Sequence, residues 1–523
     1  MRSGAKEIKI TIVTSDVKAN MPSGEEKEQI ITMTHDSSMT VMSTLVKSGL
    51  IQGSFCGGRG DCGRCRVQFI KGVMIPTMHE RSVMTAEELR QGYRLACLAR
   101  PKDDCVIRLA FAEEPKIAIL SEMMAVPENN DHLGQQNIQS NKQKSDVMIA
   151  VDLGTTTIAM QLMQIDTGKI LDTYCAMNPQ RRYGADVLSR IRASCEGQRE
   201  ELQRLVLSVL KEGVMQFSRS GRAIQGMCIA GNTTMEHLLM GYDVLSLGCS
   251  PFTPVEIGLQ EYKEPAWNFK VWITPGISAF VGGDIVAGLY ALGLIPDNRG
   301  IDYSGQCEDS KEGTDNAVGQ GARLLLDLGT NGEMAITNGR RMIVTATAAG
   351  PAFEGGAGAG IVGSDMIANV ARLLQKGVLD ETGLLAEPWF SEGIDVGEPA
   401  VRLFPKDIRA LQMAKAAVRA GVEILWNKMG RPRIGRVYLA GGFGYYLDVE
   451  AAFRIGLLPV SMRGRVTAVG NTSLAGAYHI GCDLLNGKTG KEKLEKQLSS
   501  IESINLAEQE GFDALYIRYM DLL

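Results

Sequence analysis

The sequence lacks any stretch that would direct the chain to a membrane or hold it there. Its first ten residues, MRSGAKEIKI, contain no apolar signal core. No uncharged run of about 18 apolar residues occurs in the chain. A net charge of −5 gives no overall cationic character, so nucleic acid is a poor candidate partner. These absences predict a cytoplasmic protein that binds neither a membrane nor nucleic acid.

Histidine is scarce, and the common phosphate-loop motif is missing. The five histidines include no pair at metal-ligand spacing, and we expect His237 to be an ordinary helix residue. The phrase G-x4-G-K-S/T is absent, which argues against the P-loop architecture. At 523 residues the chain is too long for a single core, and its length predicts roughly three domains.

Cysteine is present, but not in a form that predicts disulfides. Eleven is an odd number, and nothing indicates export to an oxidising compartment. We expect the singly scattered cysteines to fill core or surface positions: Cys105, Cys175, Cys195, Cys228, Cys249, Cys307 and Cys482. The others are grouped, because Cys56, Cys62 and Cys65 form C-x5-C-x2-C and Cys97 follows after 31 residues. Four thiolates suit zinc or an iron–sulfur cluster.

The residues around these cysteines favour the cluster. A zinc ribbon usually has two C-x2-C pairs, whereas this sequence has one such pair and a lone fourth cysteine. Glycines between the cysteines lower the cost of positive φ and let backbone N–H groups turn toward cluster sulfurs; they are Gly57, Gly58, Gly60 and Gly63. Zinc is the alternative, and a loop without metal is the second alternative.

Residues 1–112 are predicted to form a small α+β domain over one sheet. The expected strands are 7–14, 28–34, 65–70 and 105–111, and the expected helices are 38–50 and 85–92. The loop CGGRGDCGRCRV and the phrase YRLAC resemble the 2Fe–2S ferredoxin family, in its adrenodoxin-like variant with one extra residue between the first two cysteines. The resemblance covers residues 5–112. It implies a β-grasp fold in which Cys56, Cys62, Cys65 and Cys97 bind the cluster.

Beyond a polar, Asn/Gln-rich segment at 113–146, which we expect to be a flexible linker, strands alternate with glycine turns. MIAVDLGTTTIAMQLM and RLLLDLGTNGEMAI are similar to each other and predict two halves of related topology, divided by a polar loop at 296–320. Such turns expose N–H and hydroxyl donors to phosphate, and the aspartate can hold Mg²⁺ through water. The first turn offers Asp152, Gly154, Thr155, Thr156 and Thr157, and the second offers Asp327, Gly329, Thr330 and Asn331.

A third strand, in RVYLAGGFG, ends in Gly441, Gly442 and Gly444, with room for an adenosine against bare backbone. The segment 406–430 is predicted to be a long helix. The order of the three phrases resembles the superfamily of actin, the seventy-kilodalton heat-shock chaperones and sugar kinases. It implies an α/β fold of two ribonuclease-H-like lobes, at 147–523, around Mg–ATP. Asp186, Asp284 and Glu333 are candidates for positioning the attacking water, with a structural role as the alternative.

The fusion resembles ATP-dependent reductive activators of corrinoid proteins, which serve methyltransferases and O-demethylases of anaerobes. The phrases NPQRRYGADVLSRI, AGNTTMEHLL, FVGGDIVAGL, AAGPAFEGG and LAGGFG carry this resemblance. It implies reduction of Co(II) to Co(I) through the cluster, with a corrinoid protein and an electron donor as partners. One departure is that a middle domain found in some relatives is expected to be missing after the linker. That departure leaves a homodimer open.

Other functions remain in competition. Activators of 2-hydroxyacyl-CoA dehydratases share the ATPase fold and the reductive logic, but have no ferredoxin domain. A small-molecule kinase with a redox-sensing ferredoxin domain would need a substrate base such as Asp186 or Asp284. A chaperone-like module that binds partners is the third alternative. ATP turnover stimulated by a corrinoid protein, or by a small hydroxylated metabolite, would separate the first function from the kinase.

Overall fold

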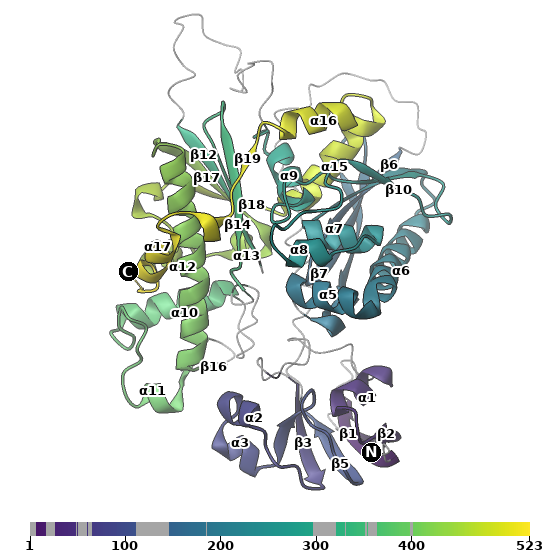
Figure 1. Ribbon diagram of the computed structural model, residues 1–523, viewed down its shortest axis with the longest axis vertical. Helices are drawn as coiled ribbons and strands as arrows, with labels where there is room; N and C mark the ends of the chain where they lie inside the picture. Colours follow the sequence, from purple (N-terminus) through teal and green to yellow (C-terminus); the bar gives the residue numbers. More distant parts are fainter. Residues whose placement is uncertain are drawn as a thin grey trace, which may run out of the picture. The chain divides into compact units, whose positions relative to one another are not determined.

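The computed structural model describes residues 7–16, 27–48, 50, 60, 65–110, 146–184, 186–295, 321–329, 331–350, 353, 363–397 and 401–522. The chain divides into two compact units (Figure 1). The first contains residues 1–115 together with 179–190, and the second contains residues 116–178 and 191–523. The predicted linker at 113–146 and the predicted polar loop at 296–320 lie outside the described residues.

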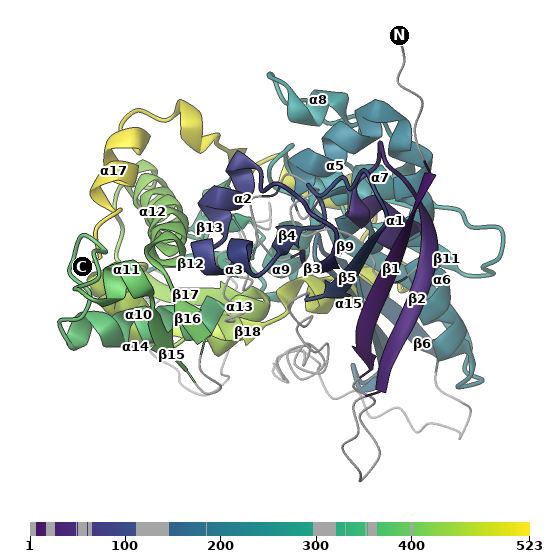
Figure 2. The ribbon, with the colours of Figure 1, turned by 90° about the horizontal axis from the view of Figure 1, so that it is seen from below.

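The first unit is built on a sheet with the order β2-β1-β5-β3-β4. Its strands are β1 (Glu7–Asp16), β2 (Lys27–Asp36), β3 (Arg66–Lys71), β4 (Tyr93–Leu95) and β5 (Cys105–Leu109). Figure 2 shows β1 and β2 as a long antiparallel pair. Alternate β1 residues, Ile10 and Ile12, are buried with Val41 and Leu45 of α1 (Val41–Lys47). This alternation is the period of two that the sequence predicted, and the β-grasp prediction is confirmed by the arrangement.

Two short helices lie between β3 and β4. They are α2 (Met78–Val83) and α3 (Ala86–Arg90). The sequence predicted α3 but not α2, because MHERSV has too few apolar residues to show a helical period. A capping box at Thr77 and Glu80 starts α2 instead. The predicted helix at 38–50 is shorter than expected, since the Thr40 side chain caps α1 and its helical residues end at Lys47.

The second unit contains two sheets of matching topology. The first has the order β10-β11-β9-β6-β7-β8 and the second β18-β17-β12-β13-β14-β19. In each sheet, a central strand pairs antiparallel with the next strand in the sequence and parallel with a later one. In the first sheet β6 pairs with β7 and β9, and in the second β12 pairs with β13 and β17. The two halves of related topology that the DLGT phrases predicted are therefore confirmed by the repeated strand order.

The strand bounds show where each sheet comes from in the chain. The first lobe has β6 (Val147–Leu153), β7 (Thr157–Gln164), β8 (Ile170–Met177), β9 (Ile224–Gly231), β10 (Gln260–Tyr262) and β11 (Lys270–Ile273). The second lobe has β12 (Ala322–Leu328), β13 (Gly332–Thr337), β14 (Met342–Thr347), β17 (Ile434–Ala440), β18 (Val466–Gly470) and β19 (Glu502–Ser503). A separate small pair consists of β15 (Ile394–Val396) and β16 (Val401–Leu403).

Helices cover both faces of each sheet. On the first sheet, Val147, Ile149 and Val151 pack with α6 (Arg199–Ser218) and α7 (Thr233–Met240). The residues between them, Met148 and Ala150, pack with α15 (Thr472–Leu485). Such strands are apolar on both faces, as expected for the centre of a sheet with helices on each side.

The second sheet is covered in the same way. Its even-numbered β12 residues pack with α10 (Gly363–Gln375), α12 (Pro405–Lys428) and α14 (Val449–Arg454). Leu325, on the opposite face, packs with α9 (Gly283–Ala291). The predicted helix at 406–430 is confirmed as α12, and Gly430 follows its end with a φ of +83°.

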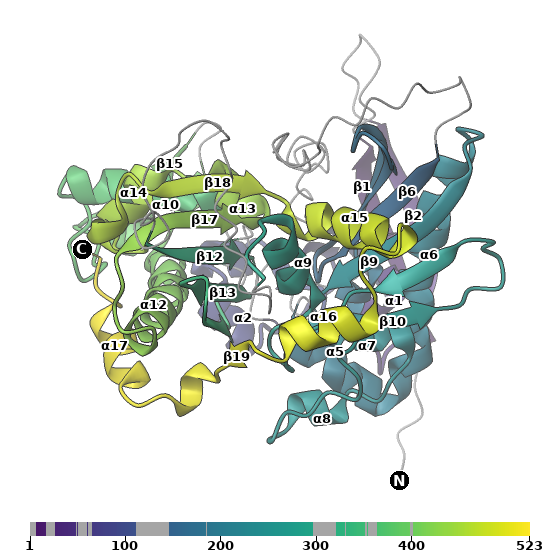
Figure 3. The same cartoon turned by 90° about the horizontal axis from the view of Figure 1, so that it is seen from above.

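Helices α9 and α15 join the two lobes. Figure 3 shows them side by side. Helix α15 packs on the first sheet, whereas residues of α9 belong to the cores on both sheets. A Cβ on Gly476 of α15 would lie 1.9 Å from the Ala287 carbonyl oxygen, and one on Gly288 of α9 would lie 2.8 Å from the Thr472 hydroxyl. The helices therefore approach closely through residues that have little or no side chain.

The remaining helices complete both units. They are α5 (Val187–Ala193), α8 (Leu245–Gly248), α11 (Trp389–Glu392), α13 (Gly441–Tyr446), α16 (Lys491–Leu498) and α17 (Phe512–Arg518), with single turns at Pro179–Tyr183, Ser194–Gln198, Val460–Met462 and Leu506–Glu508. Among the described residues, none of the helices combines the length and the apolar character needed to cross a bilayer.

Candidate cluster-binding and nucleotide-binding sites

Two of the predicted cluster ligands lie within the described residues, and they meet. Cys65 directly precedes β3, Cys97 follows β4, and the pairing of Arg66 with Leu95 brings the two cysteines together. Their Sγ atoms are 3.3 Å apart and both side chains are buried. A disulfide needs about 2.05 Å. Two thiolates at about 2.3 Å from one tetrahedral metal lie roughly 3.8 Å apart, so the pair is close enough to share an iron after the sulfurs separate by about 0.5 Å. Cys56 and Cys62 lie outside the described residues.

Backbone contacts hold the segment that carries Cys97. The Ala96 N–H donates to the Cys65 carbonyl oxygen at 2.7 Å, and the Met42 N–H donates to the Ala96 carbonyl oxygen at 2.9 Å. The Leu95 N–H donates to Glu80 Oε1 at 2.8 Å. Cys97 is therefore fixed relative to Cys65 by backbone contacts, with further contacts from α1 and α2.

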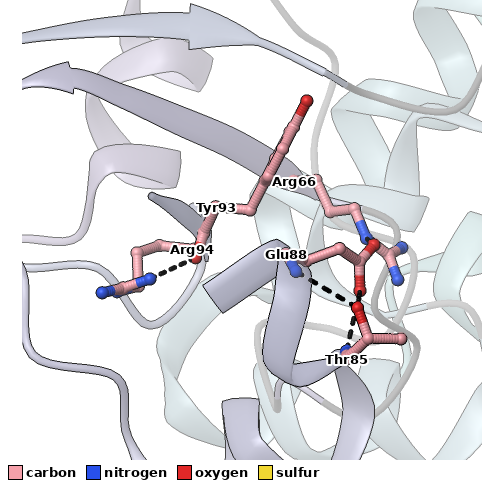
Figure 4. A network of polar contacts seen from close by, with 5 residues as sticks. All are labelled: Arg66, Thr85, Glu88, Tyr93 and Arg94. Atoms are coloured by element: carbon pink, nitrogen blue, oxygen red, sulfur yellow. Dashed lines mark hydrogen bonds and ion pairs between the residues drawn. The ribbon is translucent and has the colours of Figure 1, made fainter. Parts of the chain in front are cut away.

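Charged side chains of β3 and β4 connect these strands to residues that lie between them in the sequence (Figure 4). Arg66, next to Cys65, donates from Nε to Glu88 Oε1 at 3.0 Å, and the Thr85 N–H donates to Glu88 Oε2 at 2.8 Å. Arg94 donates to the backbone carbonyl oxygens of Met74 at 2.9 Å and Leu89 at 3.1 Å. Burial lowers the pKa of Arg94, and the negative charge of Glu80 opposes that shift.

The other cysteines behave as predicted where the structure describes them. Cys105 is buried in β5, and burial raises the pKa of its thiol to about 11. Cys228 and Cys482 are buried, whereas Cys195 and Cys249 are exposed. His237 is a buried helix residue of α7, within 2.7 Å of the Thr233 carbonyl oxygen, as expected. Cys307 lies outside the described residues.

The first predicted phosphate turn joins β6 to β7. A Cβ on Gly154 would lie 2.6 Å from the Thr157 carbonyl oxygen, so the turn is too tight for another residue. Asn178 fastens it from β8: its side chain donates to the Gly154 carbonyl oxygen, and its N–H donates to the Thr156 carbonyl oxygen, both at 2.8 Å. Thr155 is buried in the turn. The turn is thus a rigid platform held by the end of the hairpin.

Asp152, at the end of β6, is held by the start of α15. Its two carboxylate oxygens accept from the Asn471 side chain at 2.8 Å and from the Ser473 hydroxyl at 3.1 Å. Burial raises the pKa of Asp152, and these two hydrogen bonds oppose the rise. Because Asn471 also caps α15, the acid and the helix start are parts of one arrangement.

The second turn joins β12 to β13 and places two acids opposite each other. Asp327 and Glu333 are direct cross-strand partners. Like charges at such positions destabilise a sheet unless another charge compensates them. Asn331 hydrogen-bonds the Glu333 carboxylate, and the Gly329 N–H donates to the Asn331 carbonyl oxygen at 3.0 Å. Thr330 lies outside the described residues.

The third glycine phrase lies beside the second turn. β17 pairs with β12 so that Ala440 is opposite Asp327. A Cβ on Gly441 would lie 2.5 Å from Asp327 Oδ1, and the φ of Gly441 is +80°. Gly441 therefore lets the chain turn directly over the acid. Gly442 and Gly444 follow in the first turn of α13.

The acids from the two lobes act on one another. Burial raises the pKa of Asp284, in the first turn of α9, to about 7, and the charge of Asp152 adds to the rise. Burial and the charges of Asp284 and Asp327 raise the pKa of Glu333 well above its ordinary value. Four of the predicted catalytic carboxylates are therefore linked by electrostatic repulsion, each with at least one of the others. Buried acids with raised pKa values are common at functional sites.

A fifth acid, Glu236, was missed from the sequence. It lies in the first turn of α7 and is buried, and its Oε1 accepts from the Gly231 N–H and from the Thr274 hydroxyl, each at 3.2 Å. Burial and the charge of Asp284 raise the pKa of Glu236 well above its ordinary value. Two signals in the sequence could have found it: its place just after the end of an apolar strand, and its position in the phrase AGNTTMEHLL.

Asp186 has a different role in the structure. Its carboxylate accepts from the N–H of Ser189 at 2.8 Å and from the Ser189 hydroxyl at 3.0 Å. Both contacts belong to the start of α5, so the acid caps that helix. This supports the structural alternative for Asp186, and a catalytic role for it stays an untested prediction.

The residues present fit Mg²⁺ only together with a nucleotide. Within the described part of the chain, no three or more His, Cys, Asp or Glu side chains are grouped so as to hold a metal ion by themselves. Mg²⁺ is commonly bound by one or two carboxylates together with substrate phosphates and water. Asp152 and Asp327, which lie beside the two turns, are the side chains that would supply those carboxylates.

Comparisons with known proteins agree with this arrangement in outline. The family model described as "2Fe-2S iron-sulfur cluster binding domain" matches residues 25–102. "RACo middle region" matches residues 147–296, and "C-terminal domain of RACo the ASKHA domain" matches residues 321–359 and 356–523. The first lobe is therefore the middle region of that family. This match begins at residue 147 and contains the first phosphate turn, and our expectation that no further domain lies between the linker and that turn stays a prediction.

Two curated relatives match over most of the chain. The corrinoid activation enzyme RamQ of Eubacterium limosum is 29% identical over 410 residues, which cover 65% of each chain. The Co(II) methylated amine-specific corrinoid protein reductase of Methanosarcina barkeri is 22% identical over 62% of this chain and 68% of that protein. The match thus spans about two thirds of the length of each relative.

A solved structure of a "Reductive activator for corrinoid, iron-sulfur protein" has the same fold. It is 24% identical, with a TM-score of 0.60 and coverage of 98% of both chains. Because the ferredoxin, middle and ASKHA matches follow one another along the sequence, this chain belongs to the RACo family of proteins, which join a 2Fe–2S ferredoxin domain to an ASKHA domain.

Proposed function

We propose that the protein is an ATP-dependent reductive activator of a corrinoid protein, which delivers one electron through a 2Fe–2S cluster to reduce Co(II) to Co(I). The observation that carries this proposal is the union, in one chain, of a paired cysteine site and two facing sets of buried acids. The names of the two curated relatives, a corrinoid activation enzyme and a Co(II) corrinoid protein reductase, support the same acceptor.

An energetic argument explains why ATP is needed. Plant-type 2Fe–2S centres lie near about −400 mV. For one electron, an acceptor about 59 mV lower makes the transfer tenfold less favourable, which is about 1.4 kcal/mol. Nucleotide binding or hydrolysis can offset several such steps if it changes the ligation or docking of the acceptor. The ATPase domain is the part of the chain that supplies this drive.

In this proposal each group of residues has a separate task. Cys56, Cys62, Cys65 and Cys97 bind the cluster, which supplies one-electron transfer when it is present. The turns at Gly154 and Gly329 cradle the phosphates, and Gly441 leaves room for the adenosine. The acids hold the cation and the attacking water: Asp152 and Asp327 are placed for Mg²⁺, and Asp284 and Glu333 for the water.

The repulsion among these buried acids supports a site that binds a cation. Burial and mutual repulsion raise the pKa of Asp284 and of Glu333. A divalent cation next to these groups would favour their ionised forms. Asp284, with a pKa of about 7, can accept a proton from water at neutral pH, which is the property required of a general base.

The test is Co(I) formation at a fixed donor potential, with ATP, with a non-hydrolysable analogue and without nucleotide. The absorbance of the corrinoid protein reports the cobalt state. We expect full Co(I) yield only with ATP, and none from a Cys97→Ser variant under any condition. Equal yields in all three conditions would show that the nucleotide site is not coupled to the electron, and the kinase alternative would then move ahead.

A further inference from the structure

Two copies of the same local motif lie between the ligand-bearing strands. Thr77 and Glu80 form a capping box at α2, and Thr85 and Glu88 form another at α3. The contacts are nearly identical: the threonine N–H donates to the glutamate at 2.7 Å in the first box and 2.8 Å in the second. As helix caps, the two boxes are interchangeable.

The remaining carboxylate oxygen separates them. Glu88 Oε1 accepts from Arg66 Nε at 3.0 Å, at a site where the two side chains are 29% and 25% exposed. Glu80 Oε1 accepts instead from the Leu95 N–H at 2.8 Å, and Glu80 is 1% exposed. One glutamate forms a partly solvated ion pair, whereas the other places a buried carboxylate against the backbone two residues before Cys97.

Burial of the Glu80 carboxylate costs free energy of folding unless specific contacts compensate it. A buried carboxylate destabilises a fold unless hydrogen bonds satisfy it. Glu80 has three: the Leu95 N–H, the Thr77 N–H and the Thr77 hydroxyl. Arg94, whose guanidinium is nearly buried, is the cation that attracts it. A helix cap alone needs none of the contact to Leu95, because α3 is capped without an equivalent.

The place of Leu95 gives that contact its significance. Leu95 pairs with Arg66 across the strands, and the next residue, Ala96, donates to the Cys65 carbonyl oxygen at 2.7 Å. A change at the Leu95 N–H is therefore transmitted directly to the turn that carries Cys97. In a poorly solvated interior, a fixed negative charge also acts over longer distances than at the surface.

We propose that Glu80 is a positioning residue for the cluster: it fixes the Cys97 turn through Leu95, and its negative charge keeps the reduction potential of the cluster low. The proposal rests on the cluster-binding part of the proposed function and not on the corrinoid acceptor. A lower potential makes the reduced cluster a stronger donor, which suits an acceptor that is difficult to reduce.

The experiment compares Glu80→Gln, Thr77→Val and Glu88→Gln with the wild type, each as the full chain loaded with iron and sulfide. Glu80→Gln keeps the shape but removes the charge and turns one acceptor into a donor. Thr77→Val removes the threonine hydroxyl from the α2 capping box and keeps the charge. Glu88→Gln removes the same charge from the matched box. The readout is the midpoint potential in a mediated spectroelectrochemical titration, with ATP hydrolysis measured in parallel.

We expect Glu80→Gln to raise the potential by at least a tenfold change in the reduction equilibrium, which is about 59 mV for one electron. Thr77→Val and Glu88→Gln should stay within a threefold change, and ATP hydrolysis without corrinoid should be unaffected in all variants. An unchanged potential in Glu80→Gln overturns the proposal, even if the protein is less stable. An equal rise in either control also overturns it, because a cap or a diffuse charge would then suffice.

A second pair of variants decides the case in which Glu80→Gln takes up no cluster. Glu80→Asp and Glu88→Asp keep the charge but withdraw the carboxylate by one methylene. Faster loss of iron to a chelator from Glu80→Asp than from Glu88→Asp and the wild type supports the role, and equal rates overturn it. Failure of Co(I) formation in the wild type would remove the proposed acceptor but would leave these potentials and rates unaffected.

Discussion

In the first lobe, the aspartate at the end of the central strand faces an alanine across the hairpin; in the second lobe, the corresponding aspartate faces a glutamate. Asp152 is paired with Ala159, and Asp327 with Glu333. The strand orders and the DLGT phrases are otherwise repeated. The two lobes therefore provide the same scaffold with different electrostatics at one position.

The partners of the two aspartates differ in the same sense. Asp152 receives two hydrogen bonds from the start of α15, through Asn471 and Ser473. Asp327 lies against the backbone of Gly441 and opposite an acid. One aspartate is therefore held by neutral donors from α15, whereas the other faces a second acid across its hairpin. The strand order is thus the same in both lobes, and the side chains around the two aspartates differ.

The largest expected effect comes from removing the aspartate with the opposing acid. Asp327→Ala should lower ATP hydrolysis by about 10²- to 10³-fold, which is the usual loss when a preorganised electrostatic group is removed from a transition state. The cluster potential should be unchanged. Phosphate release measures the first quantity and a redox titration the second. Asp395→Ala, which removes an exposed acid paired with Arg402, is the control. Normal turnover in Asp327→Ala would show that the nucleotide lies elsewhere.

Glu333→Gln should make the second hairpin resemble the first and stabilise the protein in the absence of nucleotide. The pKa of Glu333 is raised in the folded chain, so the folded protein keeps a proton that the unfolded chain has lost. The free energy of unfolding of the wild type therefore falls as the pH rises above about 4.5, by about 1.4 kcal/mol for each unit of pKa difference.

Thermal unfolding between pH 4 and pH 8, without Mg²⁺ or ATP, measures this effect. The melting temperature of Glu333→Gln should exceed that of the wild type at pH 8, and the two should converge near pH 4. Glu450→Gln, at an exposed site beside Arg463, should show no such divergence. Parallel curves for wild type and Glu333→Gln would contradict the raised pKa and weaken the contrast between the lobes.

The smallest effect is expected from the donors of the first lobe. Asn471→Ala removes the cap of α15 and one hydrogen bond to Asp152, which together should cost about 1–2 kcal/mol of stability. Thr40→Ala removes the side-chain cap of α1, whose hydroxyl contacts Ser43 rather than an acid, so it measures the cap alone. Thermal unfolding of both variants gives the difference. If the two lose equal stability, the bond to Asp152 contributes nothing measurable.

Much of the fold followed from the sequence because its signals are local. Alternating Ile and Thr residues predicted β1, and the apolar runs before each DLGT phrase predicted β6 and β12. The ferredoxin resemblance implied that Cys65 and Cys97 would lie together, and the register of two short strands is enough to bring them there.

What the sequence did not show depends on contacts between distant residues. Helix α2 has no apolar period, and Glu80, in its first turn, is tied by a bond to Leu95, which lies 15 residues away. Glu236 lies in the phrase AGNTTMEHLL, but that phrase gave no sign of its raised pKa, which comes from burial and from Asp284 on a different helix. Asp186 looked like the other acids in the sequence, but its nearest donor, Ser189, made it a cap.

The crossing of α9 and α15 also sets a mechanical scale for the second unit. Ala287 and Gly288, where the helices touch, lie three and four residues beyond Asp284. At 1.5 Å per residue the acid is about 5–6 Å from the crossing. A turn of about ten degrees there displaces the acid by roughly 1 Å, but displaces a point about 30 Å away, the length of a 20-residue helix, by roughly 5 Å. If the helices rotate about this crossing, a displacement of about 1 Å at the acids corresponds to a displacement about five times larger at the edge of a lobe.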